Sequence, residues 1–441
     1  MRIAHLLGWY FPDSVGGTEV YVEGLSRRLV DAGHHVLIAA PDATRTAPHG
    51  YDYGGVRVFR YPVTDRPTRD ESYHRVAMRG SEQLMAWLAA ERPDILHVHS
   101  IKTGIGLPEL REARRLGIRI ITTFHLPSLG YMCHTGELME GGTRPCDGIV
   151  WPSKCAACSL THAGLPSPAS RLAGALPPWI SRGLGRVPGK VGTVLGMSAL
   201  VVDSQRMQRE LFTLLECGVV LNETASRMLQ ANGAPAAKIA INRLGVGQAQ
   251  IHRKPGPDSA PTGRPVHFGF AGRLHPAKGL VEIVRAARAI PREVDFRLDI
   301  RGPILDADAQ AFAAELRRLA ADDPRVRFEP SVSSADMPAV LTAIDVLLSP
   351  SVSFENGPTI ALEAMAVGTP VIAANVGNLT EVITDGVNGR LITAGSVDEL
   401  AAALGDAARH PESTIDVWRR RLPNVRTMDD VARDYLALYA A

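Results

Sequence analysis

Two segments in the second half of the chain carry charged residues in a pattern suited to binding a phosphorylated ligand. In the first, residues 270–280 (FAGRLHPAKGL), an apolar run ends at Ala271 and Arg273 and Lys278 follow. Lys278 stands near the expected start of a helix, and helix N-termini attract anions. Arginine offers a phosphate two parallel hydrogen bonds, and lysine offers a point charge. This pair could hold a diphosphate; a solvated basic turn is the alternative.

The second segment, residues 350–372 (PSVSFENGPTIALEAMAVGTPVI), carries two glutamates. Glu355 is expected in a loop after a strand at 346–349, and Glu363 one turn into the next helix. A carboxylate at Glu363 could accept hydrogen bonds from two hydroxyls of a ribose, and Glu355 could accept them from a sugar. Asn356, Gly357, Pro358 and Thr359 open this helix, where free backbone N–H groups are expected to point at the cleft. Alternatively, Glu355 is simply exposed and Glu363 only interacts with the helix dipole.

Short apolar runs alternate with helical patterns along most of the chain. One series of runs lies at 3–7, 35–40, 56–61, 95–98 and 118–123, and a second at 266–271, 296–300, 326–328, 346–349 and 371–373. Such alternation predicts parallel sheets covered by helices on both faces. The fold class is therefore α/β with two doubly wound domains, and ligands of such sheets bind beyond the carboxyl ends of the strands.

Composition shifts place the domain boundaries. Residues 1–247 form the first domain, 248–264 a polar linker rich in Pro and Gly, and 265–425 the second domain. The last segment, 426–441, has one apolar helix face. Lys and Arg total 48 against 46 Asp and Glu, and aromatic residues are 5%. This balance argues against nucleic acid as a partner.

The motifs GRLHPAKG and PSVSFENGPTIALEAMAVGTPVI together resemble the retaining glycosyltransferases of the GT-B fold, glycosyltransferase family 4 (group 1). The resemblance covers most of the chain. Gly16-Gly17-Thr18-Glu19 is similar to the family's glycine-rich first loop, and residues 297–302 to its second-domain strand ending in glycine. The segment RLGVG, residues 243–247, is similar to a Leu-Gly-Val-Asp element, but Gly247 stands where Asp is usual.

The resemblance implies two Rossmann-like domains facing a central cleft, with the acceptor on the first and the donor on the second. It also implies that segment 426–441 packs back on the first domain. The donor would be a nucleoside-diphosphate sugar, transferred with retention to an unidentified acceptor hydroxyl. Arg273 and Lys278 would grip the diphosphate in place of a metal ion and stabilise the departing charge, so no cofactor is expected for catalysis.

By the same resemblance, Glu355 would contact the transferred sugar and Glu363 the ribose. The backbone of Asn356, Gly357, Pro358 and Thr359 would approach the sugar and phosphate. Gly16 and Gly17 would let the backbone close over the phosphates. His125, after the strand at 118–123, occupies the place of a family histidine near the sugar; a hydrogen-bonded strand-end residue is the alternative.

Other functions fit the sequence less well. A nucleotide-sugar-binding scaffold without turnover would be favoured by loss of Arg273, Lys278 or Glu355, and all three are present. A dinucleotide-dependent oxidoreductase would need a G-x-G-x-x-G motif after a first strand, and none is found. Asp306-Ala307-Asp308 has the shape of a metal-binding Asp-x-Asp motif, but it precedes a helical pattern and is interpreted as capping acid.

A stretch rich in Gly, Pro and Cys, about 126–190, interrupts the alternation and is interpreted as an insertion. Cys133, Cys146, Cys155 and Cys158 lie close together in it, with His134 and His162 as spare ligands. Four thiolates suit a structural zinc ion; an iron–sulfur cluster, reduced thiols or a redox pair are the alternatives. Cys217 is expected in a helical, apolar context in the core.

Residues 171–190 of the insertion mix apolar side chains with Arg171, Arg182, Arg186 and Lys190. Such a segment could rest on a membrane surface or hold a lipid-linked acceptor, and an ordinary irregular surface segment is the alternative. The sequence shows no export signal and no run of about 18 apolar residues. It therefore predicts a cytoplasmic protein, and the basic apolar segment would place it at the inner face of a membrane.

Overall fold

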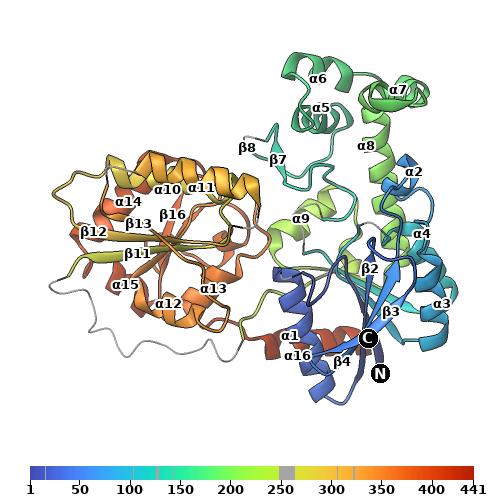
Figure 1. The fold of residues 1–441 in the computed structure, drawn as a ribbon, viewed down its shortest axis with the longest axis horizontal. Coiled ribbons are helices and arrows are strands. Elements are labelled where there is room, and N and C mark those ends of the chain that lie inside the picture. The colour runs from blue at the N-terminus through green and yellow to red at the C-terminus, as the bar shows by residue number, and fades with distance from the viewer. Residues whose placement is uncertain are drawn as a thin grey trace. The chain divides into compact units, whose positions relative to one another are not determined.

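The computed structural model describes residues 1–14, 16–102, 104–125, 129–142, 144–247, 264–304, 306–320 and 323–441. These residues divide into two compact units. Unit 1 comprises Met1–Arg243 and Met428–Ala441, and unit 2 comprises Leu244–Thr427. Of the linker expected at 248–264, only Arg264 lies within the described residues. Each unit contains its own mainly parallel sheet (Figure 1), which confirms the α/β class.

Unit 1 is built on a sheet whose strand order is β10-β9-β6-β5-β1-β2-β4-β3. All neighbours are parallel except the edge pair β3 and β4. The strands are β1 (Arg2–Leu6), β2 (His35–Asp42), β3 (His49–Tyr53), β4 (Val56–Pro62), β5 (Ile95–Val98), β6 (Arg119–Thr123), β9 (Cys217–Val220) and β10 (Ile239–Ile241). Because β1 has β2 on one side and β5 on the other, the chain reverses its direction of winding at the carboxyl end of β1.

The helices of the unit 1 body follow the expected pattern. They are α1 (Gly17–Asp31), α2 (Arg69–Ser72), α3 (Glu82–Glu91), α4 (Leu107–Arg115), α9 (Glu223–Ala231), the 3₁₀ helix η1 (Ala236–Lys238) and α16 (Met428–Ala440). Asn222 caps α9 by accepting a 2.7 Å hydrogen bond from the Ala225 amide. The chain's last helix, α16, packs on α1, where the Tyr21 hydroxyl lies 3.1 Å from that of Tyr435.

The insertion is more regular than the sequence suggested. It contains a short hairpin, β7 (Met139–Glu140) and β8 (Arg144–Pro145), and the helices α5 (Pro152–His162), α6 (Ser167–Gly174), α7 (Pro178–Leu184) and α8 (Gly189–Leu214). The expectation of a helical, core position for Cys217 was wrong. This residue begins β9, pairs with Ile121 of β6 and is half-buried. A short apolar run cannot distinguish strand from helix by periodicity alone.

Unit 2 has the strand order β13-β12-β11-β14-β15-β16, all parallel. The strands are β11 (Val266–Ala271), β12 (Phe296–Arg301), β13 (Val326–Glu329), β14 (Val346–Ser349), β15 (Val371–Ala374) and β16 (Gly389–Ile392). This is the order of a Rossmann-like sheet, and the winding reverses between β11 and β14. A ligand crevice is expected at that point.

Helices cover both faces of the unit 2 sheet (Figure 1). They are η3 (Pro276–Lys278), α10 (Leu280–Ala289), α11 (Ala307–Ala320), α12 (Met337–Ala343), α13 (Thr359–Ala366), η4 (Gly377–Glu381), α14 (Val397–Arg409) and α15 (Ile415–Arg420). One apolar cluster unites α10, α11 and α14 with the sheet, and another unites α12 and α13 with it. Asp306 caps α11 by accepting a 2.7 Å hydrogen bond from the Ala309 amide, as the capping interpretation predicted.

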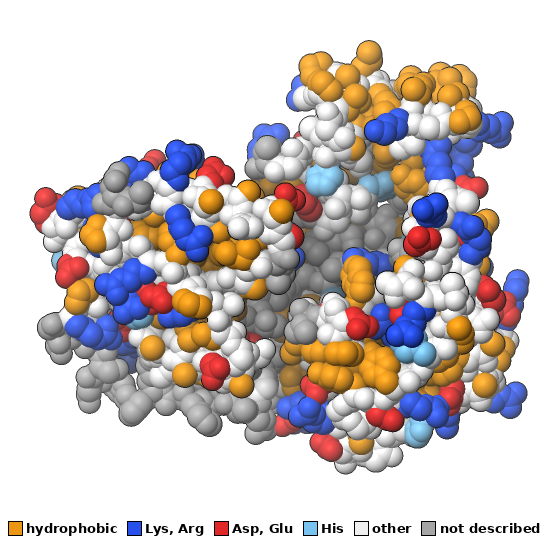
Figure 2. Space-filling view, viewed as in Figure 1, with side chains coloured by type: hydrophobic (Ala, Val, Ile, Leu, Met, Phe, Trp, Pro, Cys, Tyr) orange, Lys and Arg blue, Asp and Glu red, His pale blue; other side chains and the backbone are white. Residues whose placement is uncertain are grey.

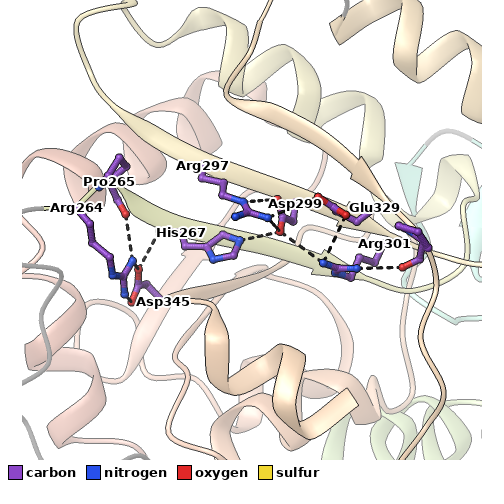
Figure 3. Close-up of polar contacts among 9 residues, drawn as sticks. Arg264, Pro265, His267, Arg297, Asp299, Arg301, Glu329 and Asp345 are labelled. Carbon is purple, nitrogen blue, oxygen red and sulfur yellow. Dashed lines mark hydrogen bonds and ion pairs between the residues drawn. The ribbon is translucent and has the colours of Figure 1, made fainter. Parts of the chain in front are cut away.

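A row of charged side chains runs across β11, β12 and β13 toward the strand ends (Figure 3). Asp299 is buried and accepts hydrogen bonds from Arg297, at 2.8 Å, and His267, at 2.9 Å. Burial alone would raise the pKa of Asp299, but these hydrogen bonds outweigh it and hold the pKa below its ordinary value. The last member of the row, Arg301, donates to the Pro330 carbonyl at 3.1 Å, so the end of β12 carries a fixed cation.

Candidate active site

Unit 2 contains an open pocket of about 380 Å³ where its winding reverses. The pocket lies at the carboxyl ends of β11, β12 and β14, the place where doubly wound sheets bind ligands. Three cations, Arg273, Lys278 and Arg301, line it against one carboxylate, Glu355. The other lining groups include Gly272, Gly302, Ser331, Ser349, Ser351, Gly357, Pro358 and Thr359. The net positive lining suits an anionic ligand.

Lys278 and Glu355 form the central ion pair of this pocket. Lys278 Nζ donates to Glu355 Oε1 at 2.6 Å, and the two side chains are 27% and 15% exposed. The Ser351 hydroxyl donates to the same carboxylate oxygen. Among the described residues, Glu355 Oε2 has no hydrogen-bond partner. The carboxylate is therefore oriented by two donors while one of its oxygens stays available to a ligand.

Two glycines set the backbone on either side of Glu355. Gly279 has φ +74°, and a Cβ there would lie 2.1 Å from the Pro350 carbonyl oxygen. Gly377 has φ +67°, and a Cβ there would lie 2.2 Å from the Glu355 carbonyl oxygen. That same oxygen accepts a 3.0 Å hydrogen bond from the Asn378 amide. The loop that carries Glu355 is therefore held between η3 and η4.

The remaining predicted residues of unit 2 differ in how they meet the pocket. Gly357, Pro358 and Thr359 line it at the start of α13, whereas Asn356 is buried beside them. Glu363 lies on the second turn of α13, is half-buried, and is not among the lining residues. Arg273 is exposed at the mouth and makes no ion pair with a described residue, so its guanidinium is accessible to a ligand.

In unit 1, the predicted glycines lie at the start of α1. Gly16 has φ −136°, an extended conformation open to any residue, and Gly17 is the first helical residue. A Cβ at Gly16 would lie 2.7 Å from Glu19 Oε2, whereas one at Gly17 would meet nothing within 4 Å. Glu19 is buried and accepts a 2.8 Å hydrogen bond from the Ser14 hydroxyl. Gly16 thus leaves room for the Glu19 carboxylate.

His125 lies at one end of a hydrogen-bonded chain of three histidines. Sequence reasoning predicted His125 but missed the other two. His125 Nε2 shares a 3.0 Å hydrogen bond with His99 Nδ1, and His99 Nε2 shares a 2.9 Å hydrogen bond with His5 Nδ1. The three residues come from the loop after β6, the end of β5 and the middle of β1. The sheet pairs His5 of β1 with His97 of β5, and His97 with Ile121 of β6, so each successive histidine of the chain lies two positions beyond the residue opposite its neighbour. Positions two apart along a strand face the same side of the sheet. The signal in the sequence was the recurrence of His near the ends of expected strands.

Burial keeps this histidine chain neutral. It lowers the pKa values of His5 and His125 to about 3, and that of His99 lies well below its ordinary value. His99 and His125 also line a small cavity of about 20 Å³ with Ser100 and Thr123. At neutral pH, His125 is therefore an uncharged imidazole that can exchange a hydrogen bond without carrying charge.

The ligand atoms of His5, His97 and His99 lie within 4.8 Å of one another, so a metal ion must be considered. His97 already uses both ring nitrogens, with the Tyr439 hydroxyl at 2.6 Å and the Thr123 hydroxyl at 2.7 Å. His99 uses both of its own with His5 and His125. Since two of the three rings have no nitrogen to spare, the cluster is better described as a hydrogen-bonded core than as a metal site.

The four predicted zinc ligands of the insertion line one cavity of about 30 Å³. Cys155 and Cys158 lie on α5, and Cys133 and Cys146 flank the hairpin β7–β8. All are free thiols and half-buried. The Gly148 amide donates to Cys146 Sγ at 3.4 Å and the Gly141 amide to Cys158 Sγ at 3.3 Å. Burial raises the pKa of both thiols, and these two hydrogen bonds oppose it only in part.

The donor set fits zinc in number and type. Zn–S bonds of about 2.3 Å place the sulfurs of a zinc tetrahedron about 3.8 Å apart. Among the described residues, no three of these cysteine sulfurs lie within 4.8 Å of one another. A bound ion would therefore draw the sulfurs inward. Of the spare ligands, His134 lines the cavity and bonds to the Ser204 hydroxyl at 2.8 Å, whereas His162 lies 3.8 Å from Glu137. Zinc stays a prediction.

Comparison with known families matches both units. A model described as "Glycosyl transferases group 1" matches residues 265–410, and one described as "Glycosyltransferase Family 4" matches residues 15–172. The first match contains the pocket residues Arg273, Lys278 and Glu355. The second contains Gly16, Gly17 and the histidine chain's outer member, His125.

Curated relatives fall into the same group. The chain is 33% identical over 205 residues to a D-inositol 3-phosphate glycosyltransferase of Kribbella flavida, a match that covers 43% of this chain and 47% of that protein. The chain thus spans about half the length of that relative. It is 26% identical over 461 residues to an MMP alpha-(1->4)-mannosyltransferase of Mycolicibacterium hassiacum, covering 100% of this chain and 98% of that protein.

Solved structures share the fold over the whole chain. Sucrose-phosphate synthase from Thermosynechococcus elongatus has a TM-score of 0.66 at 17% identity, covering 100% of this chain and 98% of that one. Anabaena Alr3699/HepE, solved in complex with UDP, has a TM-score of 0.63 at 15% identity, and each chain is covered completely. At such identities the likeness concerns the fold alone.

Two Rossmann-like units and a cationic pocket at the second switch point define a protein of the GT-B fold. The chain belongs to the glycosyltransferases of family 4, group 1, as the motifs around Lys278 and Glu355 predicted. The comparisons do not favour an oxidoreductase or a scaffold without turnover. Sequence reasoning missed Gly377 and His99, because each contacts a residue distant in sequence, and it missed Ser351 although that residue lies four positions from Glu355.

Proposed function

We propose that this protein transfers a sugar from a nucleoside-diphosphate sugar to an acceptor hydroxyl, with retention at the anomeric carbon and without a catalytic metal ion. The observation that carries the proposal is the pocket in which Arg273, Lys278 and Glu355 meet at the start of α13. The names of the relatives support it, since they include a mannosyltransferase and an inositol-phosphate glycosyltransferase. HepE, a fold neighbour, was solved with UDP and with UDP-glucose.

The donor diphosphate binds to the cationic side of the pocket. Arg273 supplies a bidentate guanidinium and Lys278 a point charge. The backbone N–H groups of Gly357 and Thr359 add partial positive charge at the start of α13, whereas Pro358 has no N–H to donate. These groups are in place before the reaction, so they stabilise the negative charge that develops on the leaving diphosphate. Fixed cations take the part that a metal ion plays in other transferases.

The sugar binds to the Glu355 side. Glu355 Oε1 is already held by Lys278 and Ser351, so Oε2 is the oxygen that accepts from sugar hydroxyls. Lys278 links diphosphate binding to sugar binding, because it contacts Glu355 and also faces the diphosphate. We assign Glu363 to the ribose on the strength of the family resemblance, and His125 to a neutral hydrogen-bonding role in unit 1.

The transfer step breaks the bond between the anomeric carbon and the diphosphate oxygen and forms one between that carbon and the acceptor oxygen. The acceptor proton passes to the departing phosphate oxygen. Attack occurs on the face that the diphosphate leaves, so the anomeric configuration is kept. Glu355 is held as a ligand to the sugar and is not used as a covalent nucleophile.

Ligand-observed NMR with a panel of nucleotide sugars tests the proposal. We expect selective binding of one donor to the wild-type protein and its loss in Lys278→Ala. The bound donor is then incubated with candidate acceptors, and the linkage of the product is determined by NMR. An inverted linkage would contradict the retaining mechanism. Absence of binding to every donor would contradict the proposed donor site.

A further inference from the structure

The insertion of unit 1 ends in a surface of exposed apolar side chains, here called the apolar tip. Leu172 on α6 is 78% exposed and Trp179 on α7 is 76% exposed. Leu184, Val187 and Val191, between α7 and the first turn of α8, are exposed as well. Figure 2 shows apolar side chains gathered on the insertion at the top of the view, with basic groups beside them. A group of exposed apolar side chains of this kind indicates an interaction site.

The charge around the apolar tip has one sign. Residues 148–202 contain no Asp or Glu, although acidic and basic residues are balanced in the chain as a whole. The same stretch contains Lys154, Arg171, Arg182, Arg186 and Lys190. Arg182 pairs with Asp203 at 2.5 Å, just beyond the stretch. Arg171, Arg186 and Lys190 are exposed and make no ion pair with a described residue.

Close packing beneath the tip keeps its apolar side chains outward. Ser181 of α7 donates from its hydroxyl to the Leu195 carbonyl of α8 at 2.7 Å. A Cβ at Gly196 of α8 would lie 2.8 Å from the Gly185 Cα, and a Cβ at Gly174 of α6 would lie 2.8 Å from the Ala157 amide of α5. These helices touch backbone to backbone through small residues. The inner side of the tip is therefore closely packed, and the exposed apolar residues are not part of a core that lacks a packing partner.

We propose that the apolar tip docks on the surface of a lipid bilayer that contains anionic lipids. Leu172 and Trp179 would enter the headgroup region, where aromatic and aliphatic side chains gain from burial. Arg171, Arg186 and Lys190 would lie at the level of the lipid phosphates, each adding electrostatic attraction. Among the described residues, no helix is long and apolar enough to cross a bilayer, so this contact is peripheral. Pairing with the tip of a second copy of this chain is less favoured, because residues 148–202 offer the basic groups no acidic counterpart.

Vesicle co-sedimentation of the full chain tests the proposal. The vesicles consist of phosphatidylcholine alone or of phosphatidylcholine with phosphatidylglycerol. We expect binding to the anionic vesicles only, weakened at least about tenfold by raised salt or by the double variant Arg186→Glu/Lys190→Glu. Equal binding to both vesicle types would overturn the proposal, as would no binding to either. The comparison of the two vesicle types uses the wild-type protein alone, so its result does not depend on whether a variant folds.

A double variant tests whether vesicle binding depends on the apolar tip or on exposed apolar side chains in general. Leu172→Ser/Trp179→Ser removes two side chains that are more than three-quarters exposed, so the fold should be unaffected. We expect loss of vesicle binding, whereas the matched control Val76→Ser/Leu116→Ser, at exposed apolar positions elsewhere in unit 1, should bind as the wild type does. Equal loss in both would overturn the assignment. Light scattering then measures the oligomeric state. A dimeric wild type that becomes monomeric in Leu172→Ser/Trp179→Ser would overturn the proposal and assign the tip to contact with a second copy.

Discussion

Lys278 Nζ lies 2.6 Å from Glu355 Oε1, although the two residues are 77 positions apart in the chain. The ion pair joins the segment after β11 to the segment after β14, the two strands between which the winding of unit 2 reverses. A cation suited to a diphosphate and a carboxylate suited to a sugar thus share one hydrogen bond. Any change to one alters the charge and position of the other.

Removing either partner should nearly abolish transfer. For Lys278→Ala and Glu355→Ala we expect kcat/KM to fall about 10²–10³-fold or more, the range seen when one charge-stabilising group is lost. Glu355→Gln tests charge separately from shape, because it keeps the oxygen that Lys278 contacts. Arg317→Ala, at an exposed position on α11, is the control. Near-normal kcat/KM in both alanine variants would contradict the site, provided that their thermal melts match the wild type.

Gly377 should be needed for the position of Glu355 rather than for chemistry. Gly377→Ala places a Cβ where only 2.2 Å separates it from the Glu355 carbonyl oxygen, so the loop must move. We expect a large loss of kcat/KM and a cost of about 1–3 kcal/mol in the free energy of unfolding. Gly386→Ala is a matched control, because Gly386 has φ +71° but no atom within 4 Å of an added Cβ. Equal activity losses in the two variants would indicate backbone strain alone.

The buried histidines should make the protein less stable in acid. The pKa values of His5 and His125 are about 3 when folded, whereas an unfolded histidine titrates near 6.5. Between these values the unfolded chain binds more protons, so the free energy of unfolding falls as the pH falls. Each such histidine contributes up to about 1.4 kcal/mol per pH unit. Urea unfolding at pH 7 and pH 5 measures this slope, and His125→Gln should make it shallower. An unchanged slope would mean that His125 is protonated in the folded state.

Metal analysis of the purified protein decides the role of the four insertion cysteines. We expect about one zinc per chain, lost in Cys155→Ser/Cys158→Ser and kept in Cys217→Ser, whose thiol lies outside the cavity. Iron with visible absorption would indicate an iron–sulfur cluster instead. Four titratable thiols without metal would indicate that the cysteines are reduced and bind no ion. Because an ion would link the β7–β8 hairpin to α5, its removal should expose residues 129–158 to proteolysis.

Chelation should not stop the catalytic step. Since Arg273 and Lys278 provide the positive charge in the pocket, initial rates with and without EDTA should agree, measured before any structural ion is lost. Rates restored only by added Mg²⁺ or Mn²⁺ would contradict the assignment of the diphosphate to these two side chains.

The fold and the meeting of Arg273, Lys278 and Glu355 in one pocket of unit 2 could be predicted because their signals are local. Alternating runs indicate strands and helices within a few residues, and the motifs around Lys278 and Glu355 each lie in one segment. The interpretation of Asp306 as a helix cap was confirmed for the same reason. Cys217 was misplaced because a four-residue strand has too few positions to show a period.

Two α/β units and the family whose motifs the chain carries follow from the order of its residues. Which groups act on one another depends on how the chain folds. The ion pair of Lys278 with Glu355, the approach of Gly377 to the Glu355 carbonyl and the chain from His125 to His5 all depend on strand order. Parallel strands bring their carboxyl ends to one edge of a sheet, whatever their separation along the chain. Sequence spacing cannot report distances set in that way.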